Sequence, residues 1–138
     1  MKPIKCFIAA VIVVLFFVSL AMAEPIGQDD SVVQGIATPI LNNILEGLKN
    51  NDYEKYTKDF DLTAKEAITQ EAFKKAVDEL KSEIGNYVEK KFMGFLNKGQ
   101  MTLVIWKAKF DQTQDDILVR LVLSKREKQY LVTGLWFE

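Results

Sequence analysis

The chain has 138 residues, 49% of them hydrophobic and 27% charged, and its 18 basic and 19 acidic residues give a formal net charge of −1. It contains no histidine and only one cysteine, which excludes a Ser-His-Asp relay and a histidine-based zinc site. The slightly acidic balance also argues against a nucleic-acid partner, because proteins that bind nucleic acids carry a basic stripe that neutralises phosphates.

Residues 1–23 have the pattern of a signal peptide, with two lysines, an apolar run over residues 6–20 and a closing Ala-Met-Ala. We expect cleavage after Ala23 and export to the periplasm or out of the cell, because an acidic residue and not a basic cluster follows that site. The alternative is an uncleaved membrane anchor, since the 18 residues from Cys6 to Ala23 are just long enough to span a bilayer.

Residues 24–138 remain after cleavage and are enough for one domain but too few for two. We expect residues 24–30 to be a flexible N-terminus and residues 31–138 to form the single domain. No cysteine remains in it and its net charge is −3, so packing alone must hold the domain together. The loop at residues 111–116 has three carboxylates but lacks the central glycine and distal glutamate of an EF-hand, and we expect no metal or cofactor.

The first predicted helix begins at Ser31, whose side chain can cap it together with Gln34. Apolar residues then recur at helical spacing as far as Leu48. Pro39 interrupts this stripe. Either Pro39 kinks one long helix, or it occupies the first turn of a second helix, and we favour one kinked helix.

Two further helices are predicted before Gly85. A short helix carries Tyr53, Tyr56 and Phe60, and a brief capped turn then ends near Ile68. The third helix follows, capped by Thr69 and ended by Gly85. Its buried stripe comprises Phe73, Ala76, Val77, Leu80 and Ile84.

After Gly85 the apolar period changes from 3.6 to 2, which predicts four strands joined by short hairpins. The predicted strands are Tyr87–Leu96, Met101–Phe110, Ile117–Ser124 and Tyr130–Phe137. Gly94 and Gly134 interrupt two of them and suggest bulges that curve the sheet. The expected fold is therefore α+β, with three N-terminal helices packed on a curved four-stranded antiparallel meander.

This order of elements, with Asn-Asp-Tyr-Glu at residues 51–54 and the terminal strand Tyr130–Leu135, resembles the nuclear transport factor 2-like, cystatin-like superfamily. The nearest resemblance is to small exported bacterial families of unknown function. It implies a cone-shaped, cystatin-like roll that can enclose a pocket, often in a homodimer, with roles from non-catalytic binding to isomerases and dehydratases. Enzymes of the superfamily commonly use a pocket His or Asp with a Tyr, and this chain has no His.

Apolar residues occupy both faces of the predicted strands. Val104 and Trp106 share one face of the second strand, while Leu103 and Ile105 lie on the other. One layer of helices can cover only one face, so we expect a second copy to meet the sheet on the other. The alternative is that the N-terminal segment folds across that face.

The candidate ligand-binding residues are Tyr56, Phe73, Tyr87, Trp106, Arg120 and Trp136. For the aromatic residues, the alternative is ordinary packing in the core. For Arg120, the alternative is an ion pair at the rim of the pocket. No catalytic residue is identified. The sequence therefore favours an exported, non-catalytic binding or interaction module that holds a small apolar ligand between helices and sheet. The alternatives are an isomerase or dehydratase using a tyrosine and a buried carboxylate, and a membrane-anchored domain if residues 1–23 are retained.

Overall fold

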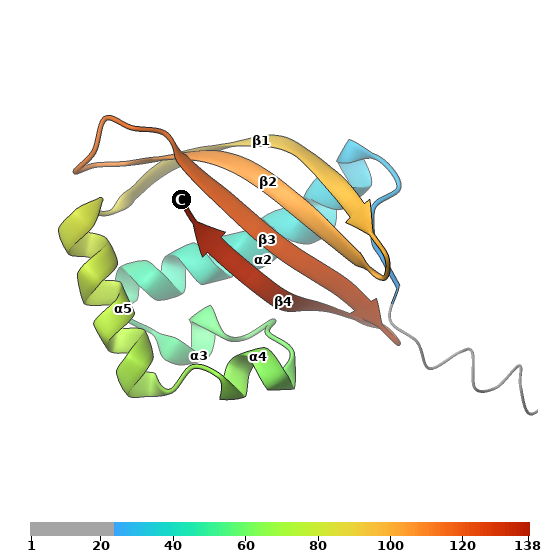
Figure 1. Ribbon diagram of the computed structural model, residues 1–138, viewed down its shortest axis with the longest axis horizontal. Helices are drawn as coiled ribbons and strands as arrows, with labels where there is room; N and C mark the ends of the chain where they lie inside the picture. Colours follow the sequence, from blue (N-terminus) through green and yellow to red (C-terminus); the bar gives the residue numbers. More distant parts are fainter. Residues whose placement is uncertain (1–23) are drawn as a thin grey trace, which may run out of the picture.

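The computed structural model describes residues 24–138 (Figure 1), and the predicted signal peptide lies outside these residues. Four helices come first along the chain, and a four-stranded antiparallel sheet follows in the order β1-β2-β3-β4. The helices are α2 (Asp30–Asn50), α3 (Tyr53–Tyr56), α4 (Leu62–Glu66) and α5 (Gln70–Glu83). The strands are β1 (Tyr87–Lys98), β2 (Met101–Phe110), β3 (Ile117–Arg126) and β4 (Gln129–Phe137). The α+β prediction is confirmed.

The first helix, α2, begins earlier than predicted. Its N-cap is Asp29, whose side chain accepts a hydrogen bond from the backbone N–H of Val32, so the prediction that Ser31 caps the helix is wrong. Both residue types can cap, and the extended backbone at Asp29 decides between them. Pro39 lies inside one uninterrupted helix, as we favoured. The helix ends where Asn51 adopts a left-handed conformation with φ of 53°.

Each strand of the meander pairs with the next in the chain, as the short hairpins predicted. The β1–β2 register shifts between Phe92 and Gly94, and the β3–β4 register shifts close to Gly134. The two glycines therefore mark bulges, which is also as predicted. A bulge increases the local twist of a strand, and Figure 1 shows the sheet curving over α2.

The core lies between α2 and one face of the sheet. Alternate residues of the two central strands point into it, and Trp106 at its centre is 1% exposed, with its ring 6.2 Å from that of Phe92. The sheet contributes Val104, Trp106, Ala108, Phe110, Ile117, Val119, Leu121, Leu123 and Val132, and α2 contributes Val33, Ala37, Ile40, Leu41, Ile44 and Leu45. In Figure 1, α2 passes behind the strands, and no described helix lies in front of them.

The shorter helices close one end and one edge of this sandwich. Helix α5 buries Phe73 and Val77. The chain between α2 and α3 turns back closely, because a Cβ atom on Gly47 would lie only 2.6 Å from the backbone nitrogen of Tyr56. Beyond α3, Phe60 forms a parallel bridge with Val132 of β4. The segment from α3 to α4 therefore borders the outer edge of β4.

Residues 24–27, expected to be part of a flexible terminus, make specific contacts with the sheet. Glu24 and Lys125 exchange two backbone hydrogen bonds of 2.8 Å. The side-chain oxygen of Thr102 accepts hydrogen bonds from the backbone N–H groups of Ile26 and Gly27. Ile26 is 5% exposed and belongs to the core. This segment therefore packs on the helix-covered face of the sheet and not on the opposite face.

Candidate functional site

The six candidate ligand-binding residues fall into four groups, of which two border one groove. Trp106 is fully buried in the core. Tyr87 lies where β1 begins, with its ring 6.1 Å from that of Phe110. The remaining four form two pairs, Tyr56 with Phe73 among the short helices and Arg120 with Trp136 on the sheet. The six residues therefore do not line one common pocket.

Tyr56 is at the centre of the aromatic cluster beside α3. Its ring lies 4.8 Å from the ring of Phe73 and 5.1 Å from that of Phe60. Burial raises the pKa of Tyr56 to about 12, because a low-dielectric environment disfavours the charged phenolate. The hydroxyl therefore stays protonated at any physiological pH.

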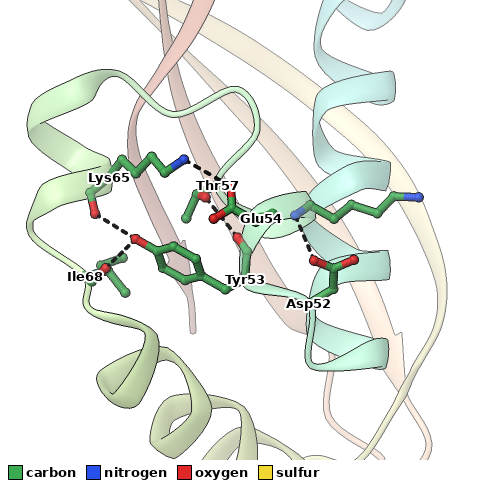
Figure 2. Close-up of polar contacts among 7 residues, drawn as sticks. Asp52, Tyr53, Glu54, Thr57, Lys65 and Ile68 are labelled. Atoms are coloured by element: carbon green, nitrogen blue, oxygen red, sulfur yellow. Dashed lines mark hydrogen bonds and ion pairs between the residues drawn. The ribbon is translucent and has the colours of Figure 1, made fainter.

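Tyr53, in the Asn-Asp-Tyr-Glu motif, holds the short helices together (Figure 2). Its hydroxyl donates to the backbone carbonyl of Ile68 at 2.8 Å and lies 3.3 Å from that of Lys65. Its own carbonyl accepts a 2.8 Å hydrogen bond from the hydroxyl of Thr57. Asp52 caps α3 by accepting from the backbone N–H of Lys55. The motif therefore builds the wall formed by α3 and α4.

The sheet surface opposite α2, which we call the outer face, is rich in apolar side chains. Its strand register places Leu96 beside Leu103, Leu103 beside Val122 and Arg120 beside Trp136. The apolar members of the outer face are Leu96, Met101, Leu103, Ile105, Leu118, Val122 and Trp136. Leu96 is 51% exposed, Met101 44% and Trp136 46%. No helix within residues 24–138 covers this surface.

Arg120 carries a positive charge at the centre of the outer face, and Lys91 and Lys107 lie on the same face beside Leu118. Its guanidinium forms an ion pair with Glu138 and lies 5.1 Å from the centre of the Trp136 ring. The indole lies against Gly134, where an added Cβ atom would be 2.5 Å from the ring. The charge of Arg120 is therefore paired within its own chain.

A groove of about 270 Å³, the β4 groove, runs between β4 and the wall formed by α3 and α4. Its lining residues are Tyr56, Phe60, Ala64, Ala67, Ile68, Val132, Thr133, Gly134, Leu135 and Trp136. None of these carries a formal charge at neutral pH. The groove thus joins two of the candidate residues, Tyr56 and Trp136. The sequence analysis missed Ala64 and Ala67, since two alanines on one short turn leave no periodic signal.

A second hollow of about 560 Å³ lies where α2 faces the β3–β4 hairpin. It is lined by Gly35, Ile36, Ile40, Lys58, Asp59, Phe60, Gln129, Tyr130 and Leu131. Asn43 donates a 3.4 Å hydrogen bond to Asp59, so one of its two charged residues is already engaged. None of its lining residues came from the predicted set.

The described part of the chain does not assemble the groups that the enzymatic alternative needs. Within residues 24–138, no hydrogen bond joins a tyrosine hydroxyl to a carboxylate. The buried acid, Asp61, caps α4 through the N–H of Ala64 and lies 3.7 Å from Arg126. The same residues contain no cluster of three potential metal ligands.

None of the helices described in residues 24–138 combines the length and hydropathy needed to cross a membrane. Among known families, one described as "Protein of unknown function (DUF3887)" matches residues 42–129. The match runs from α2 to the start of β4 and leaves out most of β4. No curated protein and no solved structure matches the chain. The α+β arrangement is compatible with the nuclear transport factor 2-like fold that the sequence resembles.

Proposed function

The chain belongs to the DUF3887 family of proteins of unknown function, and on that premise we propose that residues 24–138 are an exported, non-catalytic interaction module. The module pairs with a second copy of itself through the outer face. Membership of the nuclear transport factor 2-like superfamily, in which sheet-bearing domains often form homodimers, is part of the same proposal. The observation that carries it is the uncovered apolar surface of the sheet.

The outer face is large enough to matter for association. Residues 101–107 of β2 extend about 23 Å at ~3.3 Å per residue, and four strands ~4.8 Å apart form a sheet about 19 Å wide. The flat area is therefore roughly 450 Å², within the range of the largest apolar patches on soluble proteins. It is a little more than half of the ~800 Å² that each partner buries in a standard interface, so a dimer must also bury side chains at the rim of the face.

The charge on the outer face is compatible with burial against a like surface. Arg120 is paired with Glu138 of the same chain and stacked on Trp136, so a partner need not supply its countercharge. Lys91 and Lys107 also lie on this face, beside Leu118, and their charges must stay at the hydrated rim of the interface. A two-fold axis would bring the same apolar side chains together from both copies. Packed sheets of this kind lie about 10 Å apart with interdigitating side chains.

The test is the oligomeric state of residues 24–138 in solution. Light scattering coupled to size exclusion should give a dimer for the unmodified domain. The double variant Leu96→Glu with Met101→Glu places two charges on the outer face at positions that are already half exposed and should give a folded monomer. Leu62→Glu is the matched control, because Leu62 is 71% exposed on α4 and away from that face, and it should remain dimeric. A monomeric unmodified domain at high concentration would contradict the proposal.

Export rests on the sequence of residues 1–23. A cleaved product should begin at Glu24, which intact-mass measurement of the protein recovered from its host can establish. In the structure, Glu24 forms an antiparallel bridge with Lys125 of β3, so the residue expected at the new terminus is itself held to the sheet. A product that retains the apolar run would favour the anchored alternative instead.

A further inference from the structure

The two edges of the sheet are protected to different degrees. On β1, register shifts occur between Tyr87 and Glu89 and between Phe92 and Gly94, and charged residues occupy positions 89–91. Bulges and charges are the usual means by which proteins prevent an edge strand from pairing with another chain. On β4, the five residues 133–137 read Thr-Gly-Leu-Trp-Phe, with no charge and no proline. The one irregularity lies at the start of this stretch, between Val132 and Gly134.

The hydrogen-bonding pattern shows which backbone groups of β4 face outward. Leu118 and Glu138 exchange two backbone hydrogen bonds, of 2.7 and 2.9 Å. In an antiparallel pair such residues alternate with residues whose N–H and C=O groups point away from the partner strand. Leu135 and Phe137 therefore direct their backbone groups to the free edge. In the part of the chain that the structure describes, no loop or helix residue forms a backbone hydrogen bond with either of them.

Residues 59–61 of the same chain already pair with this edge at Val132, immediately before the free stretch. The N–H of Val132 donates to the carbonyl of Asp59 at 2.7 Å, and the carbonyl of Val132 accepts from the N–H of Asp61 at 2.9 Å. Between them, Phe60 inserts its side chain into the core and is 8% exposed. The chain then turns away into α4. The edge beyond Val132 is thus a continuation of a site that already pairs with an extended segment.

The β4 groove lies beside this free edge and provides space for a side chain. Its volume of about 270 Å³ is many times the ~30 Å³ that one water molecule occupies in the liquid. Thr133, Gly134, Leu135 and Trp136 form one side of it, and Ala64, Ala67 and Ile68 form the other. Since none of these residues is charged, an ionic side chain would lose its hydration there without gaining a partner. The groove therefore selects an uncharged, apolar side chain.

We propose that β4 accepts an extended peptide segment of another protein as a fifth strand along residues 134–137, with an uncharged apolar side chain of that peptide in the β4 groove. Hydrogen bonds to the backbone of Leu135 and Phe137 supply the pairing, and the groove supplies the preference for apolar residues. This site uses the edge of the sheet, whereas pairing with a second copy uses its outer face. The two interactions are therefore separable, although Trp136 borders both.

The experiment uses residues 24–138 and a set of uncharged seven-residue peptides that alternate Val, Leu or Phe with Thr or Ser. Peptide binding is followed by the intrinsic tryptophan fluorescence, to which the exposed Trp136 and the buried Trp106 both contribute, and amide hydrogen exchange locates the bound peptide. The expected result is binding that slows exchange at Leu135 and Phe137. The same peptides N-methylated at the residues that pair with β4 keep their side chains but lose the donors, and they should bind at least about tenfold more weakly.

Two variants of α4 test the groove without altering the sheet. Ala67→Lys places a long charged side chain at the exposed rim of the β4 groove and should weaken peptide binding at least about tenfold. Thr63→Lys, at an exposed position of α4 that does not line the groove, is the control and should leave binding unchanged. The double variant Leu96→Glu with Met101→Glu should also bind the peptides, because neither substituted residue lines the β4 groove, although the thioether of Met101 lies 3.8 Å from the hydroxyl of Thr133.

Three results would overturn the proposal. One is the absence of binding at millimolar peptide. Another is equal binding of the N-methylated peptides, which would mean that the groove takes side chains without strand pairing. The third is slow exchange at Leu135 and Phe137 in the free protein that is lost on dilution, which would assign the edge to a second copy. A failure of dimer formation alone would leave these peptide measurements unaffected.

Discussion

Replacement of Thr102 by valine should release the first residues of the domain from the sheet. The side-chain oxygen of Thr102 accepts from the N–H groups of Ile26 at 2.9 Å and Gly27 at 3.1 Å, and its hydroxyl donates to Asn97 at 2.8 Å. The side chain of Asn97 in turn donates to the carbonyl of Gly27 at 2.7 Å. Valine has nearly the same shape as threonine but offers no acceptor, so the substitution removes hydrogen bonds without opening a cavity.

The expected loss follows from the burial of these groups. Thr102 is 0% exposed and Ile26 is 5% exposed, so water cannot readily replace the lost acceptor. Each buried group left without a partner costs about 1–3 kcal/mol. The N–H of Gly27 is only partly buried and should cost about 1 kcal/mol, so for the two N–H groups we expect a loss of about 2–4 kcal/mol. With an unfolding entropy of ~2.1 cal/mol/K per residue, that loss lowers the Tm by about 8–16 °C.

Thermal and urea unfolding of residues 24–138 measure this loss, with Thr102→Ser as the control. Serine keeps the acceptor and removes only a buried methyl group, at about 1 kcal/mol. A chain that begins at Gln28 lacks both N–H donors, so Thr102→Val should cost much less there, and the two changes should couple by about 2 kcal/mol. If valine costs no more than serine, or if its effect persists undiminished in the shorter chain, then Thr102 does not act by holding Ile26 and Gly27.

Other substitutions test the burial and close packing of single groups. Because burial raises the pKa of Tyr56 to about 12, the unfolded chain loses this proton first as the pH rises above 10, and stability should fall between about pH 10 and 12 by up to ~1.4 kcal/mol per pH unit. Tyr56→Phe should remove this decrease in stability with pH. If the urea midpoint of the variant falls between about pH 10 and 12 as much as that of the unmodified domain, the buried tyrosine is not its cause. Gly134→Ala should displace the indole of Trp136, which an added Cβ would approach to 2.5 Å, and shift its emission to longer wavelength; an unshifted spectrum would refute the contact. Gly35→Ala should stabilise α2 by about 0.5–1 kcal/mol, because a Cβ there meets nothing within 4 Å, and a lower Tm would show that the space is occupied.

The order and extent of the elements could be predicted because each depends on local patterning. The predicted and observed ranges of the second strand agree at Met101–Phe110, and the predicted bulges at Gly94 and Gly134 are present. Period-2 alternation and turn residues depend only on neighbours in sequence. The start of α2 shows the limit, because Asp29 and Ser31 are both good caps and only the backbone conformation at Asp29 selects between them.

The candidate sites depended on contacts that the sequence does not encode locally. Alternation separated Trp106 from Arg120 by face, yet only the packed structure shows Trp106 sealed in the core and Arg120 paired with Glu138. Ala64 and Ala67 carry no pattern of their own, and they line a groove only because Tyr53 fixes the turn of α4 beside β4.

The sequence by itself therefore determined the α+β class, the meander and the apolar character of both sheet faces, since these follow from composition and period. Only the tertiary structure decided that residues 24–27 pack on the helix-covered face, and that within residues 24–138 no helix covers the outer face and no segment pairs with the outer edge of β4 beyond Val132. Those features depend on which distant segments meet, and many arrangements of the same helices and strands satisfy the same local pattern.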